Sequence, residues 1–171
     1  MAFTMITDRH NYDDGYISLV NIDLLNLPES IDVDGYTLTR KNEFHISLVC
    51  LKQLDKLYTS DVLTAKKLEL KQAFLDFEKS HNLIEFELTS KYRLAKRGDK
   101  VTVVAMADVP NINELFDSLM NATGINIPTQ PTHITIYTLQ PEVGIGLTSS
   151  EQVENETLEI DLPVLSAVRV G

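Results

Sequence analysis

Two of the four histidines occur in nearly identical settings, HISL at 45–48 and HITI at 133–136. Successive side chains of a β-strand point to opposite faces, so each histidine would share a face with the hydroxyl two residues on. An imidazole transfers protons near neutral pH, and a hydroxyl can donate a hydrogen bond to a phosphate oxygen. Two such strands facing one site would supply a general base and a general acid on opposite sides of one phosphorus, without a metal or a covalent intermediate.

The paired tetrapeptides resemble the signature of the 2H phosphoesterase superfamily, which includes 2′-5′ RNA ligase-like proteins and cyclic nucleotide phosphodiesterases. The residues that carry the resemblance are His45, Ser47, His133 and Thr135. Ser47 stands where threonine is commoner, which preserves the hydroxyl. The resemblance implies a single bilobal α+β domain over residues 1–171 with one motif strand per lobe. Two antiparallel sheets would line a central cleft, with helices on the outside.

The resemblance also implies an activity. Members of this superfamily open cyclic phosphates or cleave phosphodiesters at a ribose 2′ or 3′ oxygen, and they use no metal or other cofactor. By analogy His133 is the base that activates water, and His45 is the acid that protonates the leaving ribose oxygen. The sequence leaves the order of these two roles open.

The elements that must position these residues follow from the hydrophobic pattern. The pattern predicts strands over residues 16–25, 36–40, 43–51, 83–94, 101–107, 132–139, 157–162 and 165–170. It predicts helices over 60–79, with Ser60 as a possible cap, and over 110–123, with Gly124 ending the second helix. Turns are predicted at Asp34-Gly35 and at 97–100. Antiparallel strands with two principal helices indicate an α+β fold.

Five further side chains are candidate substrate contacts. Tyr137 would share the motif face of its strand and could bind phosphate or stack on a base, although ordinary packing suits it equally well. Tyr16 could stack on a base, although a strand tyrosine more often packs in the core. Tyr92 and Arg93 lie in a segment, 91–100, that holds five basic residues and forms either a phosphate-binding lip or a solvated hairpin tip. Arg40 precedes the first motif and is a further candidate phosphate contact.

His10 lies in a polar N-terminal stretch predicted to be a loop. Together with Asp13 and Asp14 it offers metal-binding side chains, but without a recognisable ligand spacing, so no metal site is predicted.

The composition narrows the function classes. The chain has 171 residues, a formal net charge of -10 and one cysteine, Cys50. A single cysteine excludes a disulfide framework and favours the cytoplasm, and no apolar run suits a membrane helix or a signal peptide. An acidic surface disfavours a broad nucleic-acid coat, although a pocket for one phosphate remains compatible.

The leading hypothesis is therefore a phosphodiesterase for a nucleotide or oligonucleotide with a 2′,3′-cyclic, 2′-5′ or cyclic-nucleotide linkage. The alternatives are a non-catalytic nucleotide-binding module and a 2′-5′ RNA ligase-like protein that processes RNA ends. Neither a membrane nor an obligate protein partner is expected.

Overall fold

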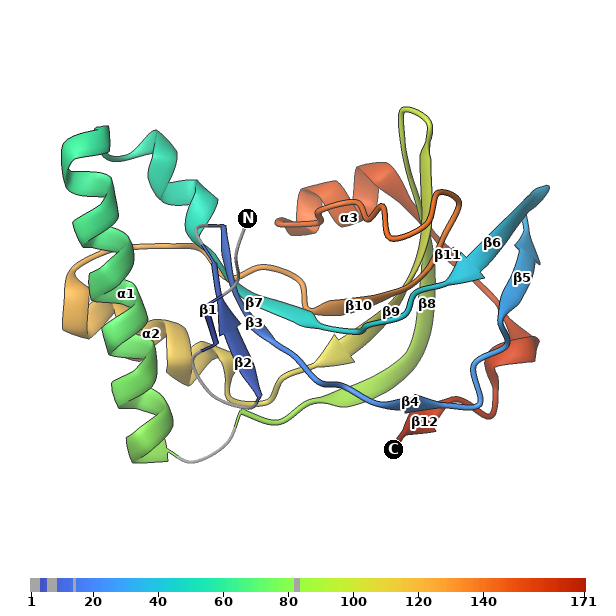
Figure 1. The fold of residues 1–171 in the computed structure, drawn as a ribbon, viewed down its shortest axis with the longest axis horizontal. Coiled ribbons are helices and arrows are strands. Elements are labelled where there is room, and N and C mark those ends of the chain that lie inside the picture. The colour runs from blue at the N-terminus through green and yellow to red at the C-terminus, as the bar shows by residue number, and fades with distance from the viewer. Residues whose placement is uncertain (1–3, 6–8, 14, 82–83) are drawn as a thin grey trace. The chain divides into compact units, whose positions relative to one another are not determined.

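The computed structural model describes residues 4–5, 9–13, 15–81 and 84–171 (Figure 1). The chain forms two compact units, each assembled from three segments. The first unit comprises Met1–Val20, Ser47–Phe86 and Val109–Gln130, and the second comprises Asn21–Ile46, Glu87–Asp108 and Pro131–Gly171. Each unit therefore joins segments that are distant in the sequence.

The elements are mixed α and β. The strands of the first unit are β1 (Thr4–Met5), β2 (His10–Tyr12), β3 (Tyr16–Leu19) and β7 (Ile46–Cys50). Its helical segments are the short 3₁₀ turn η1 (Leu51–Lys56), α1 (Ser60–His81) and α2 (Ile112–Thr123). The strands of the second unit are β4 (Leu24–Leu25), β5 (Ser30–Val33), β6 (Tyr36–Arg40), β8 (Glu87–Arg97), β9 (Lys100–Asp108), β10 (His133–Thr138), β11 (Thr157–Ile160) and β12 (Arg169–Val170). Its helical segments are α3 (Ser150–Glu156) and η2 (Pro163–Leu165).

In the first unit, the sheet has the order β1-β2-β3-β7, and α1 packs beside α2. The buried side of α1 carries Leu70, Phe74 and Phe77, whose spacing of three and four residues places them on one helical face. The second helix ends as expected, because Gly124 adopts a left-handed φ of 71° and its N–H donates to the Met120 carbonyl.

The second unit contains an antiparallel sheet of order β11-β8-β9-β10-β6-β5. Strands β8 and β9 form a hairpin in which Arg97 pairs with Lys100, and Gly98 supplies the positive φ that the tight turn requires. The register of this hairpin shifts between Leu88 and Tyr92, and Ser90 has a left-handed φ of 64°. Such a bulge bends a strand, and Figure 1 shows β8 curving along its length.

The fold confirms the α+β class and several local predictions, and it corrects others. The predicted strand over 16–25 is broken at Asn21, whose φ of 58° is left-handed, so that β3 and β4 belong to different units. The predicted strand over 165–170 shrinks to β12, because a 3₁₀ turn beginning at Pro163 occupies the preceding residues. The sequence pattern missed α3 and β5. The predicted helix end at Asn82 and strand start at Leu83 lie outside the described residues.

His10 is a core residue, so the predicted polar loop is wrong. It lies in β2 with no exposed surface, and its ring meets Phe74 edge-on at 5.2 Å between centroids. Its Nδ1 lies 3.4 Å from a carboxylate oxygen of Glu78 on α1. Burial, assisted by the neighbouring Arg9 charge, lowers the pKa of His10 to about 4. Burial likewise raises the pKa of Glu78.

The buried histidine makes the stability of the protein depend on pH. Between about pH 4 and pH 6.5 the unfolded chain binds a proton at His10 that the folded chain does not bind, so the free energy of unfolding rises with pH. We expect His10→Gln to remove up to about 3 kcal/mol of this rise, measured by urea unfolding across that range. The raised pKa of Glu78 acts in the opposite direction, so Glu78→Gln should steepen the rise; an unchanged pH dependence in both variants would contradict this account.

Candidate active site

The second motif lies on β10, an interior strand of the sheet in the second unit. It is hydrogen-bonded to β9 on one side and to β6 on the other. Ile134 and Ile136 are fully buried, whereas His133 and Thr135 are half-buried. The predicted alternation is therefore present over 133–136, and it places an imidazole and a hydroxyl together on the more accessible face.

The His133 ring is oriented by the backbone two residues earlier. Its Nδ1 lies 3.1 Å from the carbonyl oxygen of Pro131. Because a carbonyl only accepts hydrogen bonds, this contact requires Nδ1 to carry the proton, which leaves the lone pair of the neutral ring on Nε2. Burial lowers the pKa of His133, and the hydrogen bond to Pro131 opposes part of that shift. A neutral imidazole with its lone pair on Nε2 is suited to accept a proton.

The first motif differs from its prediction in one respect. His45 is exposed and precedes β7, whereas the sequence predicts a strand over 43–51 with His45 inside it. The N–H of Asn42 donates to the Glu142 carboxylate at 3.0 Å instead of continuing a ladder. The chain bends at 42–43, and regular strand structure resumes only at Ile46. Both histidines belong to the second unit.

The strand that precedes the first motif, β6, runs antiparallel to β10. Arg40 pairs with Tyr137, and the N–H of Lys41 donates to the Ile136 carbonyl at 2.9 Å. The ladder ends there, because the chain bends at residues 42–43.

Ser47 begins the second segment of the first unit. It is half-buried between the fully buried Ile46 and Leu48, so the predicted alternation holds at the hydroxyl. Its carbonyl accepts a hydrogen bond from the side-chain amide of Gln130 at 2.7 Å. The sequence analysis did not single out Gln130. The one available signal was its position three residues before His133, which does not reveal the partner.

Tyr137 is a core residue and does not share the face of His133 and Thr135. The register of β10 against β9 shifts between Thr135 and Tyr137, so that the alternation is interrupted at Ile136. Tyr137 is fully buried, and its hydroxyl donates to the Pro28 carbonyl at 2.6 Å. The structure thus makes it a packing residue in place of the predicted substrate contact. Burial raises its pKa to about 12, so the hydroxyl keeps its proton at neutral pH.

The basic hairpin is engaged within its own unit. Tyr92 is buried, with its hydroxyl 3.4 Å from the Leu165 carbonyl, and Arg93 donates to the Thr157 hydroxyl at 2.6 Å. Lys96 pairs with Asp34, and Arg97 pairs with Glu156. Of the two alternatives for this segment, these contacts favour the solvated hairpin over the phosphate-binding lip.

The other two candidate contacts, Arg40 and Tyr16, belong to different units. Arg40 is exposed, and its guanidinium donates to the Leu27 carbonyl at 2.7 Å, which commits part of its donor set to the protein. Tyr16 is half-buried in the first unit, and the ammonium of Lys52 lies 5.3 Å from its ring centroid. The aromatic ring of Tyr16 remains a predicted stacking platform for a base.

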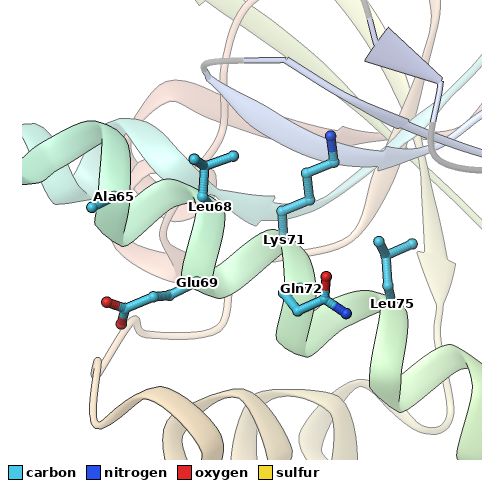
Figure 2. A pocket seen from close by; sticks show the side chains of 6 residues that line it. All are labelled: Ala65, Leu68, Glu69, Lys71, Gln72 and Leu75. Carbon is cyan, nitrogen blue, oxygen red and sulfur yellow. The ribbon is translucent and has the colours of Figure 1, made fainter.

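The pocket along α1 lies apart from both motifs in the sequence. Figure 2 shows a shallow hollow formed along α1 by Ala65, Leu68, Glu69, Lys71, Gln72 and Leu75. It contains no residue of either motif. In the described ranges, no group of three or more histidine, cysteine, aspartate or glutamate side chains is arranged to hold a metal ion. The helices of the described ranges also lack the combined length and apolar character of a membrane-spanning segment.

Comparisons of the chain with protein-family models, with curated proteins and with solved structures found no match.

The buried tyrosine hydroxyl can be tested directly. Tyr137→Phe leaves the Pro28 carbonyl without its donor, so we expect the free energy of unfolding to fall by about 1 kcal/mol in urea denaturation. Tyr92→Phe is the matched control, because its longer contact to Leu165 predicts a smaller loss. A larger loss in Tyr92→Phe than in Tyr137→Phe would contradict this assignment.

Proposed function

We propose that this protein is a metal-independent phosphodiesterase of the 2H type, with the bilobal arrangement typical of that superfamily. Its substrate would be a nucleotide or oligonucleotide with a 2′,3′-cyclic, 2′-5′ or cyclic-nucleotide phosphodiester. The observation that carries the proposal is the duplicated histidine and hydroxyl pattern, with His133 and Thr135 on the half-buried face of an interior strand.

The proposed reaction divides the work between the two motifs. His133 Nε2 accepts a proton from water as the water oxygen bonds to phosphorus, and His45 donates a proton to the ribose oxygen as its bond to phosphorus breaks. The hydroxyls of Ser47 and Thr135 donate to the non-bridging phosphate oxygens. The hydrogen bond from His133 Nδ1 to Pro131 and the lowered pKa of His133 support its role as the base.

A small substrate suits the charge of the chain better than a long RNA does. The protein has a net charge of -10, and two hairpin cations, Lys96 and Arg97, are paired with carboxylates. Binding to extended RNA relies on cations that neutralise many phosphates. A nucleotide-binding module without turnover would need neither a matched base nor an acid. We expect the protein to reside in the cytoplasm, in keeping with its single, buried cysteine.

Substitution of either motif histidine tests the proposal. We expect His45→Ala and His133→Ala each to lower kcat at least about 100-fold, because each removes one proton-transfer group. The assay is a panel of 2′,3′-cyclic mononucleotides, 2′-5′ and 3′-5′ dinucleotides and cyclic nucleotides, with the position of the product phosphate determined. Turnover should persist in a chelator.

His81→Ala, a histidine outside both motifs, is the control, and thermal melts verify that each variant is folded. Full activity in both motif variants would refute the proposed function. Calorimetric binding of a nucleotide by a wild-type protein that hydrolyses none of the panel would favour the binding module.

The pH dependence tests the assignment of the two roles. The base must be neutral, so kcat/KM should rise with pH through the pKa of His133 and fall again as the acid loses its proton. Because burial lowers the pKa of His133, the midpoint of the rising limb should lie below 6.5. NMR titration of the His133 ring should give the same midpoint. A rising limb that follows the titration of His45 would reverse the roles.

A further inference from the structure

Gln130 links the strand of the first motif to the chain that leads into the second. Its side-chain amide donates to the backbone carbonyl of Ser47 at 2.7 Å. The side chain is 7% exposed, so little water competes for this bond. Ser47 is the first residue of one segment of the first unit, and Gln130 is the last residue of another. The bond therefore joins two chain segments that each lead directly to a motif histidine.

Two attachments flank the motif histidines along the chain. Ser47 and Gln130 are each seven residues from the Arg40–Tyr137 pair, in opposite directions along the chain. The Arg40–Tyr137 pair is made by the backbone within the second unit, and the Ser47–Gln130 contact is made by a side chain within the first unit. His45 and His133 lie on the stretches between these two attachments.

The chain between Gln130 and His133 is unusually constrained. The ring of Pro131 fixes its own φ, and it also restricts the backbone of Gln130 before it. The Pro131 carbonyl accepts the hydrogen bond from His133 Nδ1. Thr132 is held through its hydroxyl and its carbonyl, which both bond to the backbone of Ala107. Gln130 is joined directly to this stretch through its peptide bond to Pro131.

A buried glutamine at this position lowers the stability of the fold unless the hydrogen bond that its amide donates is needed. Its Oε1 is buried and makes no hydrogen bond within the described part of the chain. A buried polar atom without a partner is unfavourable by about 1–3 kcal/mol. An apolar side chain of similar size, such as methionine, would fill the same space without that cost.

We infer that Gln130 is a positioning residue for the reaction proposed above: its amide holds the Ser47 backbone and, through Pro131, orients the His133 ring. The expected effect of Gln130 on turnover rests on the proposed function, whereas its expected effect on the His133 ring does not. A displacement of about 1 Å at a reacting group can cost about 100-fold in rate without weakening substrate binding equally.

The test compares Gln130→Met and Gln130→Glu with the wild type. Both variants keep the approximate size of the side chain and remove the amide donor. We expect kcat to fall about 10- to 100-fold in both, with KM within about threefold of the wild type. Gln140→Met is the matched control, since Gln140 is an exposed glutamine beyond the other end of β10, and it should retain wild-type kcat.

A second measurement does not depend on activity. Nitrogen-15 NMR of the His133 ring reports which nitrogen carries the proton, and we expect the share of the Nδ1–H form to fall in both Gln130 variants and not in Gln140→Met. Folded Gln130 variants with wild-type kcat and an unchanged ring tautomer would overturn the inference. If the wild type cleaves no member of the substrate panel, the proposed function fails, and the tautomer still decides whether Gln130 orients His133.

Discussion

The candidate site depends on the pairing of β10 with β9 over residues 133–135 and with β6 at the far end of the strand, at Tyr137 and Thr138. A strand with neighbours on each side has little freedom to slide or rotate, because its N–H and C=O groups are engaged in two ladders. With β9 and β6 in place, the faces of β10 are fixed, and Ile134 and Ile136 must point into the core. His133 and Thr135 are then directed to the other face by the geometry of the strand. The side chains of His133 and Thr135 are thus positioned by backbone pairing and apolar packing, and the hydrogen bond to Pro131 orients the His133 ring.

Burial has different consequences for His10 and His133. Burial lowers the pKa of both His10 and His133, since a charged ring loses hydration in each place. His10 has no exposed surface and lies between Phe74 and Glu78, so its neutral ring contributes to packing and to the pH dependence of stability. His133 is half-buried, and its Nδ1 is directed to a backbone carbonyl. A lowered pKa alone therefore does not identify a base; access and ring orientation distinguish the two.

Sequence patterns predicted the features that arise from neighbouring residues. The range of β6, the turn at Gly98 and the helix end at Gly124 depend on local backbone preferences, and all three are present. The class of the fold and the alternation over 133–136 follow from hydrophobic periodicity.

The features that sequence patterns missed depend on partners far along the chain. The bend before His45 involves Glu142, and the bond to Ser47 comes from Gln130. The bulge near Ile136 turns Tyr137 into the core toward Pro28, which no periodic pattern could reveal. Similarly, the burial of His10 is not predicted, because nothing local in the sequence indicates that Phe74 and Glu78 of α1 will pack against it. Residue type and spacing could thus nominate the motifs, but the geometry that would make them act together is set by long-range pairing.

The distribution of charge bears on how such a site would treat a phosphate. Lys96 and Arg97 are occupied by Asp34 and Glu156, and the Arg40 guanidinium is partly committed to Leu27. A phosphate bound by Ser47 and Thr135 hydroxyls and one protonated imidazole would be held less tightly than one held by several arginines. Weak binding of the ground state is compatible with catalysis, because only interactions that strengthen in the transition state lower the barrier. A charged imidazole that donates its proton as the ribose oxygen departs is such an interaction, so the acidic net charge of the chain is compatible with the proposed phosphodiester cleavage.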